Sequence, residues 1–589
     1  KTSGNLEYIF PGNHYLGHGG EYSPWPIDGS GRNLSFYEKN NFGGAKSYHV
    51  FGKITDFYGA YWHDDHFGFG HYSPYDEKPG KKIWIWGLAD DGMIWENLLT
   101  DTDGQYTEIQ SGRLYNQGNM GSSRTPFKSR SFTPGTTDEW TEYWYPVKET
   151  EGLKISFPQG SLNLRQNDHK INLWFCPNEE THETLEVRDG KKVVYSKRFD
   201  SLPMQVVTGS FDYTGDDKDL CVWLGNKLIY DADPEKNLLK RPVESPGDFN
   251  WNSAYGHYLQ GRELRQHREY KEALAEYEKS LEVEPWYLPA LTGMSDLACR
   301  RLEYQASLEY ARKALSVDTY DPEANMMYGL SSLALGDTIS AIDGFSIASA
   351  GISRRSAACN ALASIWMNKG NYERALSYAE KSLITNQSGS EAIQLKIHCL
   401  LKMGRLQGAE EELSKLEQKD PLNHFSRFER YLISPGTETA ALVHSSITAE
   451  FPQETFLEYA LWYYRNGQLS DASKILELGP EDHPVVLIWR AYLDHLKGNE
   501  QNASLALTRV VRSSVSDDWK LAYYAGLIYL AAGNKEKGKD LWESCGMRPD
   551  FYPFYLSRSK LYDATDQQAV ADIGKALEIG KSDWRTGLY

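Results

Sequence analysis

The sequence predicts a multidomain β + α protein, in which an antiparallel β-sandwich region is followed by an all-α solenoid of repeats. Its 589 residues exceed what one hydrophobic core usually supports. The first part contains short runs of alternating apolar and polar residues between Gly and Asp clusters, whereas helical periodicity begins after Asn250. We therefore expect a β-sandwich domain over residues 1–240, a linker over residues 241–250 and a helical domain over residues 251–589.

The expected strands of the first domain are rich in β-branched and aromatic residues. Examples are residues 81–87 (KKIWIWG), 154–157 (KISF) and 192–195 (KVVY). Asp and Gly residues around Gly215 are typical of a turn between two such strands. Each run therefore predicts a strand of an antiparallel sandwich.

The helical part repeats with a period of 34 residues. Gly336, Gly370 and Gly404 are separated by this spacing, at the expected turn between two helices. Small residues follow the same period where two helices would touch: Ala273, Ser307, Ala341, Ala375 and Ala409. A 34-residue period of this kind is typical of the tetratricopeptide repeat. We expect eight or nine helix pairs to stack into a right-handed solenoid of about 330 residues, with the small residues in its core.

Charge and hydropathy limit the possible partners. The chain has 63 basic and 81 acidic residues and a formal net charge of −18, which disfavours nucleic acid as a partner. No run of about 18 apolar residues is available to span a membrane. The concave face of a solenoid often holds an extended peptide, so a protein partner in the repeat groove is one interpretation and bracing of the other domain is another.

The start of the chain shows neither an initiating Met nor a basic and apolar leader, so we expect it to be processed or truncated. The compartment is not readable from these residues. We expect a bacterial protein, with the periplasm or the cell surface favoured over the cytoplasm.

A polar cluster interrupts the aromatic residues 61–72, which we expect to form one strand. Alternation would place His63, Asp65 and His71 on one face of that strand. Three interpretations stay open: a divalent metal site, the hydrogen-bonding and proton-transfer groups of a carbohydrate site, and solvated or salt-bridged strand residues. The metal site would need a hairpin after Phe67, because the third ligand otherwise lies more than about 20 Å along the strand. We predict neither a metal ion nor a cofactor.

Two nearby strands carry the strongest candidates for sugar chemistry. Trp84 and Trp86 share one face of their strand, and an indole can stack on the C–H face of a sugar ring or fill a sandwich core. Glu108 alternates with Tyr106 and Gln110, so a carboxylate and an amide project from the same side. Burial beside aromatic residues raises the pKa of a carboxyl group toward the range that acid–base catalysis needs. Other carboxylates nearby are Glu96, Asp101 and Asp103.

The order of four segments resembles a known family. These segments are residues 79–87 (PGKKIWIWG), 95–101 (WENLLTD), 106–112 (YTEIQSG) and 140–147 (WTEYWYPV). They resemble the galactose-mutarotase-like β-supersandwich domain of unassigned function that bacteria fuse to C-terminal tetratricopeptide repeats. The resemblance covers residues 5–240 and implies a large sandwich with a carbohydrate site in its concave face. Family members carry another β domain before this one, so the sandwich is expected to be incomplete at its N-terminus.

The resemblance also assigns candidate residues. Glu108 matches the carboxylate of the family's Tyr-x-Glu-Leu-x-x-Gly strand, and His63 and His71 match polar positions in the preceding segment. The family's Asp-Asn-Gln after that strand is reduced here to Asn116 and Gln117. Relatives on the fold include aldose epimerases, glycoside hydrolases and lyases.

The main functional prediction is a carbohydrate-active enzyme, most simply a glycoside hydrolase acting on an oligosaccharide or glycoside. Glu108 would be the acid or base, and His63 and His71 would handle protons or bind hydroxyls. The predicted substrate contacts are Trp84, Trp86, Asp65, Gln110 and Tyr106. The alternatives are a non-catalytic glycan-binding scaffold with protein-docking repeats and an aldose-epimerase or lyase activity at the same site. A second carboxylate facing Glu108 would favour the enzyme, and an isolated Glu108 would favour binding alone.

Overall fold

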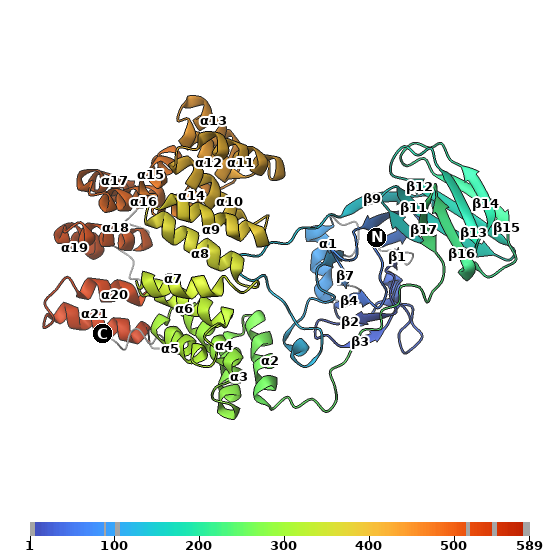
Figure 1. Cartoon of the computed structure of the whole chain (residues 1–589), viewed down its shortest axis with the longest axis horizontal. Helices are drawn as coiled ribbons and strands as arrows, with labels where there is room; N and C mark the ends of the chain where they lie inside the picture. The colour runs from blue at the N-terminus through green and yellow to red at the C-terminus, as the bar shows by residue number, and fades with distance from the viewer. Residues whose placement is uncertain (1–5, 87–89, 101–105, 514–518, 545–549, 581–589) are drawn as a thin grey trace. The chain divides into compact units, whose positions relative to one another are not determined.

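A computed structural model describes residues 6–86, 90–100, 106–513, 519–544 and 550–580 (Figure 1). The predicted fold class is confirmed, because antiparallel sheets are followed by helical repeats. The chain divides into two compact units, each of which is described by itself. The first comprises Lys1–Thr133 and Thr137–Thr319, and the second comprises Pro134–Thr136 and Tyr320–Tyr589.

The first β-sandwich pairs a four-stranded and a five-stranded antiparallel sheet. The four-stranded sheet has the order β1 (Leu6–Ile9), β5 (Phe57–Trp62), β6 (Phe67–Tyr72) and β9 (Tyr143–Lys148). The five-stranded sheet has the order β3 (Tyr22–Pro24), β2 (His14–Leu16), β4 (Lys46–Phe51), β7 (Gly80–Ile85) and β8 (Thr107–Gly112). Tyr8, Tyr58, Ile83 and Ile85 belong to one buried cluster to which both sheets contribute, so alternate residues of each strand form the core.

A second β-sandwich follows directly. One of its four-stranded sheets has the order β10 (Ile155–Phe157), β11 (Gly160–Asn167), β12 (Lys170–Pro177) and β15 (Val207–Asp212). The other has the order β14 (Lys192–Arg198), β13 (Thr184–Asp189), β16 (Leu220–Leu224) and β17 (Lys227–Asp231). Leu162, Phe175, Val187 and Val222 lie in its own buried cluster. The β region therefore contains two sandwiches, where the resemblance implied one large one. Alternation in a sequence identifies strands but does not determine which strands share a sheet.

Short helical segments connect the strands. They are η1 (Tyr37–Lys39), η2 (Asp90–Gly92), α1 (Met93–Leu99), η3 (Met120–Arg124) and η4 (Asp217–Asp219). The strands predicted near residues 81–87, 154–157 and 192–195 correspond to β7, β10 and β14.

The single strand expected over residues 61–72 is wrong. The chain makes two antiparallel strands, β5 and β6, with Trp62 opposite Phe67 and residues 63–66 in the turn between them. His66 takes a φ of 49° in this turn. The physical reason is the four-residue polar run HDDH, which is solvated more easily at a hairpin end than inside a sheet. His63, Asp65 and His71 therefore do not follow one alternation.

Twenty described helices follow the β region and form ten consecutive pairs, compared with the eight or nine predicted. The bounds are α2 (Ala254–Gln266), α3 (Tyr270–Val283), α4 (Leu288–Arg300), α5 (Tyr304–Leu315), α6 (Pro322–Ala334), α7 (Thr338–Ala348), α8 (Arg355–Asn368), α9 (Tyr372–Thr385), α10 (Ser390–Lys402), α11 (Leu406–Lys419), α12 (His424–Ile433), α13 (Thr437–Ser446), α14 (Pro452–Arg465), α15 (Leu469–Leu478), α16 (Pro484–Leu496), α17 (Glu500–Ser513), α18 (Trp519–Ala531), α19 (Lys535–Ser544), α20 (Tyr552–Ser559) and α21 (Gln567–Ile579). Helices α2 to α5 belong to the first unit, and α6 to α21 stack as successive pairs in the second (Figure 1).

The predicted turn and core positions of the repeat are confirmed. Gly336, Gly370 and Gly404 have φ values of 84°, 70° and 72° at the turns between paired helices. These left-handed values favour Gly, which has no Cβ. The small residues of the 34-residue period are fully buried: Ala273, Ser307, Ala341, Ala375 and Ala409.

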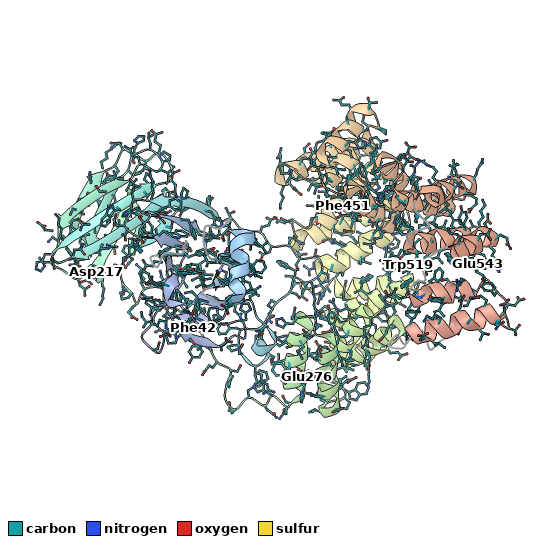
Figure 2. The ribbon with its side chains drawn as sticks, turned by 180° about the vertical axis from the view of Figure 1, so that it is seen from behind. Phe42, Asp217, Glu276, Phe451, Trp519 and Glu543 are labelled. Atoms are coloured by element: carbon teal, nitrogen blue, oxygen red, sulfur yellow. The ribbon has the colours of Figure 1, made fainter. Side chains whose placement is uncertain are left out.

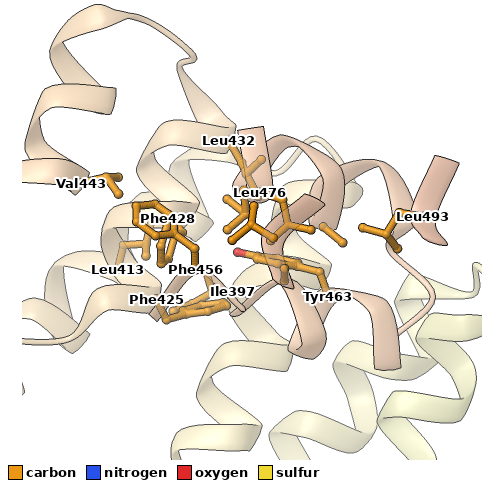
Figure 3. Packing of buried hydrophobic residues seen from close by; sticks show 14 of the residues in the cluster. Ile397, Leu413, Phe425, Phe428, Leu432, Val443, Phe456, Tyr463, Leu476 and Leu493 are labelled. Carbon is orange, nitrogen blue, oxygen red and sulfur yellow. The ribbon is translucent and has the colours of Figure 1, made fainter. Parts of the chain in front are cut away.

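The core of the second unit is largest around α10 to α16. Phe425, Phe428, Phe456 and Tyr463 pack there with aliphatic side chains from neighbouring helices (Figure 3). Exposed aromatic residues also occur in both units, and Figure 2 labels Phe451 among the repeats. Among the described helices, none is both long and apolar enough to cross a membrane.

Candidate functional site

The five-stranded sheet of the first sandwich has one face in the core and one face turned away from it. Strand register places Ser47, Trp84 and Glu108 opposite one another in a first row on the outer face. A second row contains His49, Lys82 and Gln110. We call Lys82, Trp84, Glu108 and Gln110 the β7–β8 face. The β7–β8 face arises because successive side chains of a strand point to opposite sides of the sheet. Ile83 and Ile85 of β7 are fully buried on the opposite side.

Glu108 lies half-buried on this face among neutral and cationic groups. The Gln110 amide donates a hydrogen bond to its Oε2. Burial raises the pKa of Tyr106, and the charge and hydrogen bond of Glu108 raise it further. Burial lowers the pKa of Lys82, and the opposing charge of Glu108 limits this effect. In the part of the chain that the structure describes, no second carboxylate contacts Glu108. Asp101, Asp103 and the side chain of Glu96 lie outside the described residues.

The predicted indoles belong to an aromatic cluster at one side of the face. The rings of Trp84 and Trp86 have centroids 5.4 Å apart, and Trp95 of α1 lies 5.4 Å from Trp86. The Lys82 ammonium lies 4.9 Å from the Trp84 centroid, and His18 lies 5.3 Å from it. Trp84 is therefore largely surrounded by its own chain.

A cavity of about 490 Å³ adjoins the second row of this face. Its walls come from β4, β7, β8 and the long connection from β8 to β9. Lining residues that matter below are His49, Lys82, Gln110, Asn116, Gln117 and Trp140. The size is within the range of small-ligand pockets.

Hydrogen bonds link three residues of the cavity lining, Lys82, Gln117 and His49. The Lys82 ammonium donates to Gln117 Oε1. The Gln117 backbone N–H donates to His49 Nε2 at 3.1 Å, and His49 Nδ1 donates to the Leu16 carbonyl at 2.9 Å. Burial lowers the pKa of His49 to about 3, so this imidazole is neutral and both its nitrogens are engaged. Asn116 is 6% exposed, and its Nδ2 finds no hydrogen-bond partner among the described residues.

The cavity lining also includes an indole that donates a hydrogen bond. Trp140 is 41% exposed, and its Nε1 donates to Glu142 Oε1 at 3.2 Å. Glu142 Oε2 accepts from His71 Nε2 at 2.8 Å, from Ser111 Oγ at 3.0 Å and from the buried Lys78 ammonium. The Lys78 ammonium also lies 5.3 Å from the Trp140 centroid.

The charge states in this network follow from its contacts. Burial alone would raise the pKa of Glu142, but hydrogen bonds from Lys78 and His71 lower it to about 2. Burial lowers the pKa of His71 to about 4, although Glu142 opposes this shift. At neutral pH a neutral imidazole therefore donates to an ionised carboxylate. That carboxylate fixes the Trp140 ring at the cavity.

The structure brings some of the predicted site residues together and separates others. Gln110 lines the cavity, Trp84 and Glu108 lie in the neighbouring row of the same sheet, and Tyr106 directly precedes β8. His71 reaches the cavity only through Glu142. Three predicted residues have other surroundings: His63 bonds Glu7 of β1 at 2.8 Å, Asp65 is exposed in the hairpin turn, and Trp86 packs on Trp95.

Sequence reasoning missed the residues that complete the site, namely Lys82, Asn116, Trp140 and Glu142. One signal was present, since Trp140, Glu142 and Trp144 alternate before and within β9. Both indoles donate to the intervening carboxylate, Trp144 at 3.3 Å. The remaining carboxylate of the cavity, Asp138, is 2.8 Å from Arg113 Nε. Within the described ranges, no group of three or more His, Cys, Asp or Glu residues is placed to hold a metal ion.

Comparison with known proteins separates the two parts of the chain. Residues 1–147 match a family described as a domain of unknown function (DUF5107). The chain is similar to a tetratricopeptide repeat protein from Parabacteroides merdae, at 15% identity over 50% of this chain and 98% of that one, with a TM-score of 0.31. It is also similar to YrrB, described as a TPR protein with an unusual peptide-binding site, at 19% identity over 31% and 93%, with a TM-score of 0.27. A third similar structure is the C-terminal part of a TPR protein from Cytophaga hutchinsonii, at 13% identity over 44% and 97%, with a TM-score of 0.28.

The family match covers the first sandwich region, and the tetratricopeptide-like character of the later part follows from its 34-residue period and paired helices.

Proposed function

We propose that this protein is a non-catalytic saccharide-binding scaffold, in which the cavity of the first sandwich binds a sugar and the helical repeats dock a protein. The observation that carries the proposal is that a cavity of about 490 Å³ is lined both by Asn116, whose Nδ2 has no hydrogen-bond partner among the described residues, and by the Trp140 indole. A pyranose ring has an apolar C–H face that stacks on an indole. Its hydroxyls satisfy amide and ammonium donors such as those of Asn116 and Lys82.

The charge states favour binding over hydrolysis. Glycoside hydrolysis needs a carboxyl group that stays protonated near neutral pH and a second carboxylate at a defined separation. Glu142 is held ionised by Lys78 and His71, and Asp138 is paired with Arg113. Glu108 contacts the Gln110 amide. Glu142 is therefore a fixed anion rather than a proton donor.

Two matched variants test the binding site. Trp140 and Trp144 both donate to Glu142 and are both about half-exposed, but only Trp140 lines the cavity. We expect Trp140→Ala to lower the affinity for a binding mono- or oligosaccharide at least about tenfold. Trp144→Ala should change it less than about twofold. Titration calorimetry with a saccharide panel measures both, and equal losses in the two variants would contradict the proposed site.

A catalytic function at the same face is the second candidate. It is favoured by His18, whose Nε2 has no partner among the described residues and whose pKa is lowered by burial. With Glu108 it would give the imidazole and carboxylate of an aldose epimerase or glycoside hydrolase. The assay is turnover of the same saccharides by wild type and Glu108→Gln. If wild type turns over a saccharide and Glu108→Gln does not, the catalytic function replaces the binding proposal. Saccharide binding by wild type without turnover supports the binding proposal.

A further inference from the structure

A short piece of the β8–β9 connection belongs to the helical unit. In the sequence Pro134–Thr136 lie between β8 and β9 of the first sandwich, yet they belong to the second compact unit together with Tyr320–Tyr589. They form a tight turn in which Gly135 has a φ of 71°. The segment is therefore a bound turn within the second unit.

One helix pair, α8 and α9, provides its contacts. The side chain of Asn386, directly after α9, donates a hydrogen bond from Nδ2 to the Gly135 carbonyl at 2.8 Å. The turn also lies against the first turn of α8, because a Cβ on Gly135 would lie 2.7 Å from the backbone nitrogen of Ala357 and 2.9 Å from its Cα. Only a glycine fits this approach, since both the backbone conformation and the space exclude a side chain.

The recognising amide is particular to this repeat. At the equivalent positions of the 34-residue period the chain has Glu284, Asp318, Ile352 and Asp420. A carboxylate or the aliphatic side chain of Ile352 cannot donate a hydrogen bond to a carbonyl group. The repeat that contacts the turn is therefore the one whose side chain can bind it.

We propose that α8 and the end of α9 form a binding site for a Pro-Gly turn, and that this chain's own Pro134–Thr136 occupies it. A protein partner of the repeats would then present a small turn of the Thr-Pro-Gly-Thr type and compete with the internal one. The inference rests on the protein-docking half of the proposed function and is independent of the saccharide half. The internal turn competes with an external peptide for the site. Because the internal turn is tethered, its effective concentration is high, and the external peptide binds more weakly.

The test uses a labelled peptide of residues 128–140 and the full chain carrying Gly135→Val. This variant should release the internal turn, so fluorescence anisotropy should show at least about tenfold tighter peptide binding than to wild type. Gly43→Val is the matched control, since Gly43 has a φ of 68° and nothing lies within 4 Å of its added Cβ. It should bind the peptide as weakly as wild type does. Gly135→Ala provides a milder second variant, and circular dichroism verifies folding of each chain.

Recognition by the site itself is tested in the released background. Asn386→Asp has the same shape but replaces the amide donor with a carboxylate, so Gly135→Val combined with Asn386→Asp should lose the gain in affinity. A peptide with Val in place of Gly135 should not bind. The proposal is overturned if Gly135→Val binds no more tightly than Gly43→Val, or if Asn386→Asp leaves binding unchanged. Saccharide titrations of the same proteins report separately on the cavity.

Discussion

His71 Nε2 lies 2.8 Å from Glu142 Oε2, although 71 residues separate the two in the chain. The imidazole comes from β6 and the carboxylate precedes β9, which is the neighbouring strand of the sheet. Glu142 in turn accepts hydrogen bonds from Trp140 and Ser111, both of which line the cavity. His71 is therefore linked through Glu142 to two residues that line the cavity, and it is not itself part of the lining.

The buried state of His71 predicts acid sensitivity of the first sandwich. Its pKa is lowered from 6.5 to about 4 in the folded protein, so the unfolded chain binds a proton more readily. Stability should be complete above pH 6.5 and decline by about 3 kcal/mol as pH falls through 4. Denaturant unfolding across this range measures it. His71→Gln keeps a donor for Glu142 but should flatten the slope, and an unchanged slope in that variant would assign the titration elsewhere.

Part of this arrangement was predictable from the sequence, and part was not. Strand alternation correctly placed Gln110 with Glu108 on β8, because the pattern is local. It placed His63 with His71 incorrectly, since the polar run between them forms a hairpin turn. The pairing of His71 with Glu142 depends on which strands become neighbours in the sheet. No local periodicity contains that information.

The helical half contains a buried charged network that predicts the opposite pH response. His398 and Glu429 are fully buried, with Nδ1 and Oε1 2.9 Å apart, and Asp471 lies 3.5 Å from the other imidazole nitrogen. Burial would lower the pKa of His398, but the two carboxylates raise it to about 9. Its stabilising contribution should be complete below pH 6.5 and lost as pH rises through 9.

Replacement of His398 tests that network directly. His398→Leu leaves the buried Glu429 without its cation, whereas Asp471 keeps Lys402 at 2.9 Å, so the variant should destabilise the second unit by about 3–5 kcal/mol near neutral pH. It should also remove the alkaline decline described above. Urea unfolding followed by helical ellipticity at several pH values reports both effects. A wild-type protein with constant stability between pH 6.5 and 9 would contradict the charge assignment.

At two turns between paired helices the residue in the left-handed conformation is not Gly but Arg268, with a φ of 65°, or Leu302. Leu302 stands 34 residues before Gly336 and has a φ of 63°, which is costly for a residue with a Cβ. Leu302→Gly should raise the free energy of unfolding by about 1 kcal/mol, because the strain relieved exceeds the entropy that Gly loses. Gly370→Ala is the reciprocal control and should lower it by about 1 kcal/mol. Both are measurable by urea unfolding, and a destabilising Leu302→Gly would mean that the half-exposed Leu302 side chain contributes more than its backbone costs.

Asn116, whose Nδ2 has no hydrogen-bond partner in the described part of the chain, gives the most discriminating prediction. A buried donor without a partner costs free energy in the unliganded protein, and an apolar side chain of similar size removes that cost. Asn116→Leu should therefore raise or preserve the free energy of unfolding, by up to about 1–2 kcal/mol, while weakening saccharide binding at least about tenfold. If Asn116 served only the fold, Asn116→Leu would lower the free energy of unfolding and leave the affinity for saccharide unchanged. Thermal unfolding with and without saccharide separates the two, because the ligand should raise the melting temperature of wild type and leave that of Asn116→Leu nearly unchanged.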